Sequence, residues 1–479
     1  MGDVCEEITV GFVGPMTSEY REAGVPFLRS MNIEPFRINK TDLKFVSPAF
    51  HARISKSRLR AGDVVIVRTG APGTAAVVPD WMHDGNCSDL VIARPGPGVD
   101  ARFLCYYVNA VTHHIVNEHV VGAVQQHFNV GAAKSLKLPL PPLPEQRAIA
   151  RVLGGLDDKI ELNRRMNRTL EDLARGVFRS WFVDFDPVVK PSKGFAGPSR
   201  GFAGPSKGLA GSGSPRPSSG GGSVPLASPS AGAAPADLFP KRLVDSPLGP
   251  IPEGWRVGTV GEIGTNPRRG VLPSEVDATT PYIGLEHMPR RCIALDDWGT
   301  AADVSSGKSR FARGEILFGK LRPYFHKVGV ALIDGVCSTD VIVAAPKKEC
   351  WFGVLLGHLS SDEFIDYVDG ASGGTRMPRT GWGDMARYQI VIPPEPIVAS
   401  YSAWMRQVAE MLRIHAHESR SLAALRDALL PQLLSGEIRL READRAVDDA
   451  LRSNSPLPRA GGNKRPRAGM AAGTSKGRA

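Results

Sequence analysis

The chain has 479 residues, of which 42% are hydrophobic and 23% are charged, and its formal net charge is +10. The hydrophobic content excludes global disorder and is enough for two or three ordinary cores. The excess positive charge lies in two segments without acidic residues, 187–236 and 451–479, so the remainder of the chain is nearly neutral. Net charge alone therefore gives no argument for nucleic-acid binding by the folded part.

The six cysteines show neither a CxxC pair nor the spacing of zinc ligands, and no apolar run approaches the roughly 18 residues that a membrane span needs. Nothing at the N-terminus has the basic, apolar and small-residue order of a signal peptide. We therefore expect a cytoplasmic chain without a bound metal and without a membrane partner.

The sequence repeats itself at an offset near 252 residues. The segment Gly62-Asp-Val-Val-Ile66 returns as Gly314-Glu-Ile-Leu-Phe318, and Cys87-Ser88 returns as Cys337-Ser338. Downstream, Leu140-Pro-Pro142 returns as Ile392-Pro-Pro394. This period is far longer than a solenoid unit, so it predicts two copies of a whole domain together with its extension.

Each copy begins with a mixed module. In residues 1–142, short β-rich runs bounded by Gly, Pro, Asn and Asp occupy 63–67 and 90–93, and a helix follows near 101–117. In residues 241–394, the corresponding runs occupy 315–318 and 341–344, and a helical stretch follows near 351–368. Both modules are therefore predicted to be α+β.

After each Pro-Pro pair the hydrophobic period changes to alternating steps of four and three, which is typical of the seam of a coiled-coil helix. We predict one long helix over 143–186 and a second over 395–440. The seam of the first consists of Ile149, Leu153, Leu156, Ile160, Asn163, Asn167, Leu170, Val177 and Trp181. The seam of the second consists of Tyr401, Met405, Val408, Leu412, His415, Leu422, Leu429 and Leu433.

Both seams are polar near their middle, at Asn163 and Asn167 in the first and at His415 and Ser419 in the second. Polar seam residues cost stability unless they set the register or orientation of the helices. An antiparallel pair brings the two polar centres opposite each other and sends the two modules to opposite ends. The predicted fold is α+β, with two pseudo-repeated globular modules separated by two long antiparallel coiled-coil helices.

Two segments have the composition of disorder. Residues 187–240 are rich in Gly, Pro and Ser, and GFAGPSR, GFAGPSK and GLAGSGS follow one another there in tandem. Such a composition cannot build a core and predicts a flexible linker. Residues 441–479 are predicted to be a basic disordered tail.

Two similar but diverged modules on a stiff spacer suit a partner that is read at two places a fixed distance apart. Duplex DNA fits this geometry, because half-sites one helical turn apart lie about 34–36 Å from each other and a pseudo-twofold protein matches the local dyad of a duplex. Loops supply the side chains that contact base edges and phosphates. The residues expected to contact DNA are Arg68, Thr69, Gln125, Gln126, His127 and Asn129 in the first module and Lys320, Arg322, Tyr324, Thr375, Arg376 and Arg379 in the second.

Several stretches carry a resemblance to a known family. Leu140-Pro-Pro-Leu-Pro-Glu-Gln-Arg147, with the helix that follows and the segment SWFVDFDP at 180–187, closely resembles the central conserved region of the specificity subunit of type I restriction-modification enzymes. Leu430-Pro-Gln-Leu-Leu-Ser-Gly-Glu-Ile438 is similar to the C-terminal conserved region of that family. Residues 62–73 and 376–388 are similar to its target recognition domains.

The resemblance implies a DNA sequence-specificity subunit that does no chemistry itself. Each target recognition domain would read one half of a split, asymmetric target in double-stranded DNA, and the helices would set the gap. The implied partners are two methylation subunits and restriction/translocation subunits, which would bring S-adenosylmethionine, ATP and Mg, whereas this chain would hold no cofactor. The complex would be a site-specific deoxyribonuclease and adenine-N6 methyltransferase that acts in defence against foreign DNA.

Two other interpretations stay open. A coiled-coil scaffold or adaptor would use the same modules to bind protein instead of DNA. An ATP-dependent enzyme would use residues 302–309, which match a loose phosphate-loop pattern but lack its first glycine and a preceding buried strand.

Overall fold

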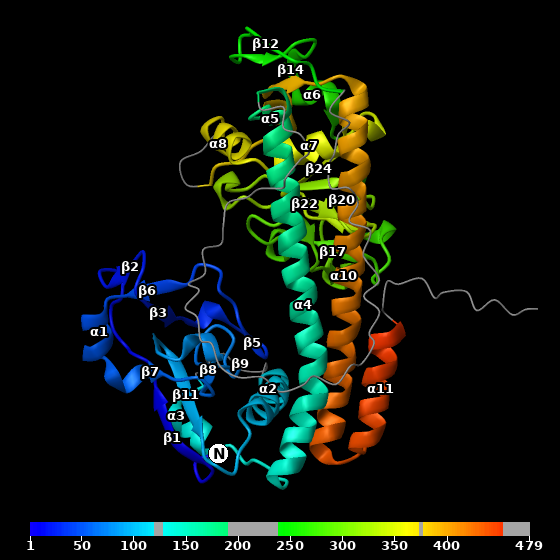
Figure 1. The fold of residues 1–479 in the computed structure, drawn as a ribbon. Coiled ribbons are helices and arrows are strands. Elements are labelled where there is room, and N and C mark those ends of the chain that lie inside the picture. Colours follow the sequence, from blue (N-terminus) through cyan, green and yellow to red (C-terminus); the bar gives the residue numbers. More distant parts are fainter. Residues whose placement is uncertain (119–127, 190–237, 373–376, 454–479) are drawn as a thin grey trace, which may run out of the picture.

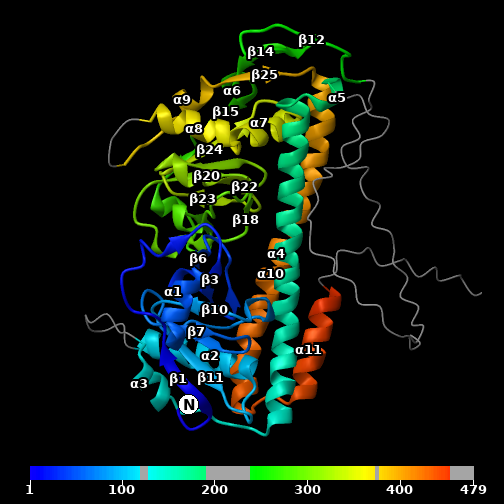
Figure 2. The ribbon, with the colours of Figure 1, turned by 60° about the vertical axis from the view of Figure 1, so that its left-hand side comes forward.

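A computed structural model describes residues 1–118, 128–189, 238–372 and 377–453. Two long helices, α4 (Leu143–Phe182) and α10 (Glu395–Ser435), form an antiparallel rod, and one globular module lies against each half of it (Figures 1 and 2). We call the described part of residues 1–142 module 1 and residues 238–394, as far as described, module 2. In the part of the chain that the structure describes, no helix is long and apolar enough to cross a membrane.

Module 1 contains two sheets. Its strands are β1 (Cys5–Val10), β2 (Tyr20–Arg21), β3 (Val25–Leu28), β4 (Ile33–Glu34), β5 (Arg37–Ile38), β6 (Lys44–Val46), β7 (Arg58–Leu59), β8 (Val64–Val67), β9 (Ala75–Val77), β10 (Gly85–Cys87) and β11 (Leu90–Pro95). Its helices are α1 (Pro48–Arg53), α2 (Ala101–Glu118) and α3 (Val130–Ser135). One sheet has the strand order β1-β11-β8-β9 and the other has the order β2-β6-β3-β10-β7.

Strand β8 shows why the central strands of the modules are continuous apolar runs in the sequence. Val64 and Ile66 pack on the side of the sheet that α2 covers, whereas Val65 and Val67 pack toward the second sheet. Successive side chains of a strand point to opposite faces, so a strand that is covered on both sides is apolar at every position.

Module 2 repeats this topology. Its strands are β12 (Leu243–Val244), β13 (Ile251–Pro252), β14 (Arg256–Thr259), β15 (Gly264–Thr265), β16 (Gly270–Val271), β17 (Pro281–Ile283), β18 (Ala294–Leu295), β19 (Gly299–Thr300), β20 (Lys308–Phe311), β21 (Ile316–Gly319), β22 (Val328–Ala331), β23 (Gly335–Cys337), β24 (Val341–Pro346) and β25 (Gln389–Ile392). Its helices are α6 (Val260–Ile263), α7 (Phe352–Leu359), α8 (Asp362–Gly370) and α9 (Trp382–Ala386).

The order β15-β24-β21-β22-β18 contains the order of the first sheet of module 1, with β24-β21-β22 in the place of β11-β8-β9. In the second sheet, β20-β23-β17 takes the place of β7-β10-β3, and the edge strand β16 has no counterpart in the described part of module 1. Even the parallel pairing recurs, because Cys87 is opposite Leu28 and Cys337 is opposite Ile283. The predicted fold class, two pseudo-repeated α+β modules on two long helices, is confirmed.

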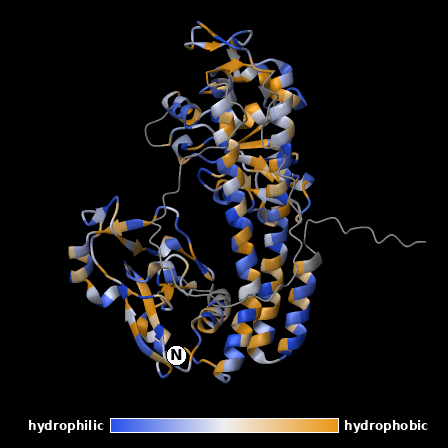
Figure 3. Ribbon diagram, in the orientation of Figure 1, coloured by the Kyte–Doolittle hydropathy of each residue, from blue (hydrophilic) through white to orange (hydrophobic). Residues whose placement is uncertain are grey.

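The predicted seam residues lie in the contact between α4 and α10, and all are buried except Leu170, which is half-buried against the same core. The two polar centres do meet: Asn163 Nδ2 donates to Glu418 Oε2 at 2.8 Å, and His415 Nδ1 lies 2.7 Å from Asn167 Oδ1. Apolar and hydrophilic residues alternate along both helices (Figure 3). Gly436, in the left-handed conformation at φ 75°, ends α10 before the predicted limit at residue 440.

The prediction of a disordered tail over 441–479 is wrong for its first part. Residues up to 453 form helix α11 (Leu440–Ser453), which turns back and packs beside α4 and α10 (Figure 1). Leu440, Ala443 and Val447 share one helical face, and Ala443 and Val447 are buried there. The helix was not predicted because charged residues separate its few apolar positions, so its apolar stripe is narrow. Residues 454–479 lie outside the described residues.

The predicted flexible linker, 187–240, includes residues at both of its ends that belong to the folded part. Val188, in the short helix α5 (Asp186–Val189), is buried, and so is Phe239. The Phe239 ring lies 5.4 Å from the Trp181 ring at the end of the rod. Isolated large apolar residues at the margins of the low-complexity stretch therefore belong to the core, and residues 190–237 lie outside the described part.

Candidate nucleic-acid interface

Corresponding loops follow the central strand of each module, residues 68–74 after β8 and residues 320–327 after β21. The first residue of each loop is basic and faces an aspartate just before the neighbouring strand. Arg68 Nη1 lies 2.9 Å from Asp89 Oδ1, and Lys320 Nζ lies 3.9 Å from Asp340 Oδ1. The same acid–base pair therefore positions the start of the loop in both modules.

In module 1 the structure brings together Arg68, Thr69 and Asn129. Thr69 Oγ1 donates to the same aspartate, Asp89 Oδ2, at 2.8 Å, and the main chain of Phe128 donates to Arg68 O at 3.1 Å. Asn129 Oδ1 accepts the amide of the third residue that follows, at 2.9 Å, so Asn129 is the N-cap of α3. The other predicted residues of this module, Gln125, Gln126 and His127, lie outside the described residues.

In module 2 the predicted residues come from two segments joined by main-chain hydrogen bonds. Arg322 N donates to Pro378 O at 2.9 Å, and Thr380 N donates to Lys320 O at 3.1 Å. Arg379 Nη2 lies 3.6 Å from Asp340 Oδ1, so Arg379 and Lys320 share this carboxylate. Tyr324 lies in the same loop with half of its surface exposed, whereas Thr375 and Arg376 lie outside the described residues.

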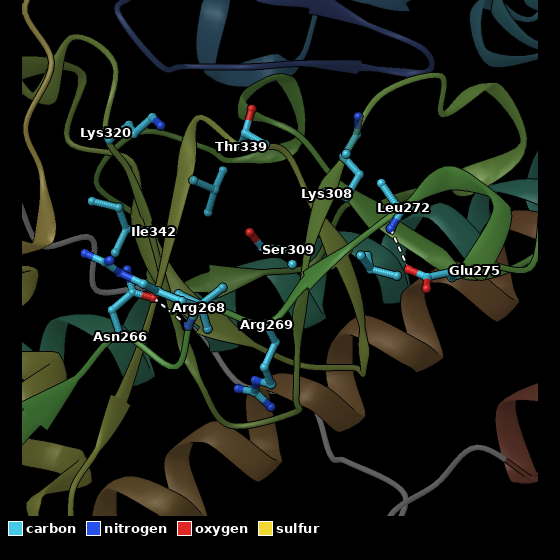
Figure 4. Close-up of a pocket in the computed structure, with 15 residues that line it drawn as sticks. Asn266, Arg268, Arg269, Leu272, Glu275, Lys308, Ser309, Lys320, Thr339 and Ile342 are labelled. Carbon is cyan, nitrogen blue, oxygen red and sulfur yellow. Dashed lines mark hydrogen bonds between the residues drawn. The ribbon is translucent and has the colours of Figure 1, made fainter.

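A groove that the sequence analysis missed crosses module 2, with a volume of about 680 Å³. Four basic side chains line it, Arg268, Arg269, Lys308 and Lys320, and the one acid among the lining residues is Glu275. Figure 4 shows Lys308 and Lys320 on either side of Thr339, with Arg268 and Arg269 across the groove from them. Such an excess of cations along a concave surface attracts phosphate groups.

Local structure positions these cations. The Arg268 amide donates to Asn266 Oδ1 at 3.1 Å in a tight turn where Arg268 has φ 51°. The Arg269 guanidinium pairs with the Glu315 carboxylate, and Lys308 Nζ donates to Ser306 O at 2.9 Å. The adjacent arginines were a signal in the sequence. Their place in the same groove as Lys308 follows from the pairing of β16 with β20, which the sequence analysis did not predict.

Residues 302–309 do not form a nucleotide-binding loop. Such a loop is followed by a helix whose first amides face the phosphates, whereas Lys308 begins the strand β20. The ATP-dependent enzyme therefore loses the one feature that favoured it. In the described ranges, no cluster of three metal-ligating side chains is present.

Two polar side chains of α4 hold the modules on the rod, one at the start of the helix and one further along it. At the start of α4, Gln146 is fully buried and accepts the Asp100 amide at 3.0 Å while donating to the carbonyls of Gly98 and Pro141. Further along α4, the Glu171 carboxylate accepts the amides of Ile293 and Ala294 at 3.2 and 3.0 Å. Burial raises the pKa of Glu171, and the two amide hydrogen bonds oppose that shift.

Comparisons with known proteins show which proteins this chain is similar to. The family model of the type I restriction modification DNA specificity domain matches residues 17–172. The chain is 25% identical over 411 residues to the type I restriction enzyme HindI specificity subunit of Haemophilus influenzae, with 80% of this chain and 88% of that protein covered. It is 23% identical over 361 residues to the type I restriction enzyme MjaIX specificity subunit of Methanocaldococcus jannaschii, with 73% of this chain and 71% of that protein covered.

Among solved structures, the type I restriction-modification S subunit from M. genitalium aligns over 90% of this chain and 94% of its own, with 13% identity and a TM-score of 0.46. The sequence matches to these two specificity subunits extend over most of the chain. Over most of its length, this chain is therefore similar to type I restriction-modification specificity subunits.

Proposed function

We propose that this chain is the DNA sequence-specificity component of a type I restriction-modification complex and that its two modules read a bipartite, asymmetric duplex target. One observation carries the proposal: two modules of the same topology, with different loops, lie on opposite halves of one antiparallel rod. Like modules suit the two halves of a duplex site, and unlike loops suit halves of different sequence. In this role the chain carries out no reaction itself.

The basic groove of module 2 supports DNA, and not protein, as the ligand. Arg268 and Lys308 make no ion pair within the described residues, so their charge is available to phosphates. The two neighbouring segments carry Arg322 and Arg379, and arginine is a residue type that contacts both phosphates and guanine edges in DNA. The adaptor interpretation explains neither the groove nor the arginines beside it.

The proposed partners are methylation subunits, two to each chain, and restriction/translocation subunits. S-adenosylmethionine, ATP and Mg would be held by those subunits, and this chain would hold no cofactor. The exposed faces of α4 and α10 are the surfaces to which we assign the methylation subunits. Because the ligand is DNA, the proposed compartment is the cytoplasm.

Lengthening the rod tests its role as a spacer. One heptad is inserted between Asn163 and Asn167 and another between His415 and Ser419, where the two helices face each other. The insertion adds about 10 Å, so the gap between half-sites should grow by about three base pairs. Sequencing the methylated sites of a host that carries the chain with its methylation subunit reads the gap directly.

Seven residues inserted within 190–237 provide the matched control and should leave the gap as it is. A gap that stays constant in the heptad variant, with methylation retained, contradicts the proposed spacer. Retention of the wild-type complex on scrambled DNA as strongly as on its site favours the adaptor instead.

A further inference from the structure

The loops after β8 and β21 occupy equivalent places in the two modules but differ in length and chemistry. Ile66 is opposite Ala75 in module 1, and Phe318 is opposite Val328 in module 2, so the loop of module 2 is one residue longer. Both loops have left-handed backbone near their two ends. In module 1 these positions are Gly70 and Gly73, at φ 91° and 89°.

In module 2 the same two positions are Arg322 and His326, at φ 51° and 52°. A left-handed backbone is favourable for glycine but strained for these residues, so the surrounding contacts must hold it. Arg322 N donates to Pro378 O at 2.9 Å, and His326 O accepts Arg291 N at 2.9 Å. The buried His326 ring also lies 3.0 Å, through Nε2, from Ser360 O. Both ends of the loop are therefore anchored.

Between the anchors, the turn Pro323–Phe325 presents one aromatic ring to solvent. Tyr324 is 50% exposed, and its ring packs edge-on against Phe325 with 4.8 Å between centroids. The guanidinium groups of Arg290 and Arg322 lie 4.0 and 5.9 Å from the centroid of the Phe325 ring. The loop of module 1, with Gly-Ala-Pro-Gly at 70–73, has no aromatic residue.

The position of this turn connects it with the DNA surface. Lys320 is both the first residue of the loop and a lining residue of the basic groove. A tyrosine ring that packs on a phenylalanine ring, which two arginines contact in turn, suits the apolar edge and the flanking phosphates of a base pair. Exposure of such a ring at the cost of two strained residues indicates that the exposed position has a function.

We propose that Tyr324 is a specificity-determining residue for one half of the DNA target. Its ring contacts base edges in the half that module 2 reads, and Arg290 and Arg322 meet the adjacent phosphates. Module 1 reads the other half without an aromatic contact from the corresponding loop. This inference rests on the proposed function and adds to it the residue and the type of contact.

The test uses the complex of the full chain with its methylation subunit and a library of duplexes randomised in both half-sites. Retained duplexes are sequenced for the wild-type chain, Tyr324→Ala and Tyr324→Phe. Tyr367→Ala is the matched control, because Tyr367 is also an exposed tyrosine of module 2 but lies on α8. Tyr324→Ala should lower base discrimination about tenfold in one half only, whereas Tyr324→Phe and Tyr367→Ala should select the wild-type sequence.

The proposal is overturned when Tyr324→Ala selects the wild-type sequence in both halves, or loses discrimination equally in both. Retention of the unaffected half-site shows that the Tyr324→Ala chain is folded. A wild-type complex that enriches no bipartite sequence overturns the proposed function as well, and this outcome differs from one confined to the Tyr324 variants.

Discussion

The two modules share a strand order but are attached to the rod in different ways. In module 2 the attachment is a continuous core, because one cluster of buried residues joins Phe178 and Trp181 of α4, Tyr401 of α10 and Phe352 of α7. In module 1 the cores of the two sheets are separate from the core of the rod. From helix α2, Phe103 and Tyr106 pack into the half of the rod that is formed by the start of α4 and the end of α10. We call this half the lower rod and the other half the upper rod.

Polar contacts add to these apolar contacts at the attachment of module 1. Arg426 of α10 lies over the Phe36 ring at 4.2 Å and pairs with Asp157 of α4 at 2.6 Å, and Tyr106 donates to the same carboxylate. The duplication therefore kept the strand order while the contacts with the rod diverged. Since local stability follows buried apolar contact, module 2 and the upper rod should unfold as one unit and module 1 should separate more easily.

The largest effect is expected from a substitution in the core that module 2 shares with the rod. Trp181→Ala removes one of the largest buried side chains and should lower the free energy of unfolding by about 4 kcal/mol. Hydrogen exchange followed by mass spectrometry should show faster exchange in module 2 and the upper halves of α4 and α10 together. Phe27→Ala, at a buried ring of module 1, is the control and should open module 1 alone. Equal opening of both modules by Trp181→Ala contradicts the comparison.

A smaller effect should loosen module 1. Arg426→Ala leaves the partly buried Asp157 carboxylate without its cation, and the expected loss is about 3 kcal/mol. Exchange should accelerate in α2 and in the β4–β5 hairpin, while module 2 keeps its protection. Arg426→Lys keeps the charge but loses the planar contact with Phe36, so its effect should be intermediate. An Arg426→Ala chain with unchanged exchange in α2 would show that the charged contact does not hold module 1.

The sequence predicted those features that depend on local period. The seam positions repeat every three or four residues, and each buried strand is apolar along its length, so both are visible in the sequence. Helix α11 was not predicted, because Ala443 and Val447 stand among charged residues and become a buried face only against α4 and α10. A narrow stripe of this kind indicates a helix only when its neighbours are known.

The site was predicted only in part, for a related reason. Loop position and residue type predicted Arg68, Lys320 and Tyr324 as DNA contacts, and these stay predictions. The groove was missed because it depends on the pairing of β16 with β20, which are separated by residues 272–307, and the pairing of distant strands is not encoded in a short window. The binding of Gln146 to main-chain groups was likewise not predictable, since main-chain partners leave no trace in residue identity.

The smallest effect is expected from lowering the pH, and it should again differ between the two modules. His358 of α7 lies in the core between module 2 and the rod, with its ring 5.0 Å from that of Phe178. Burial lowers the pKa of His358 from 6.5 to about 4. Between pH 6.5 and pH 4, His358 is therefore protonated in the unfolded chain but neutral in the folded chain. The free energy of unfolding consequently falls as the pH falls through this range. Between pH 7 and pH 5 the expected loss is about 2 kcal/mol.

In module 1, the buried Asp63 has the opposite effect. Burial raises the pKa of this carboxyl, and a carboxyl with a raised pKa stabilises the folded state as the pH falls. Exchange measured at pH 7 and pH 5 should consequently show module 2 loosening before module 1. His358→Leu should reduce the pH slope without abolishing it, since burial also lowers the pKa values of His326 and His415. An identical slope in the wild-type and His358→Leu chains would mean that His358 is not the group that makes the attachment of module 2 sensitive to acid.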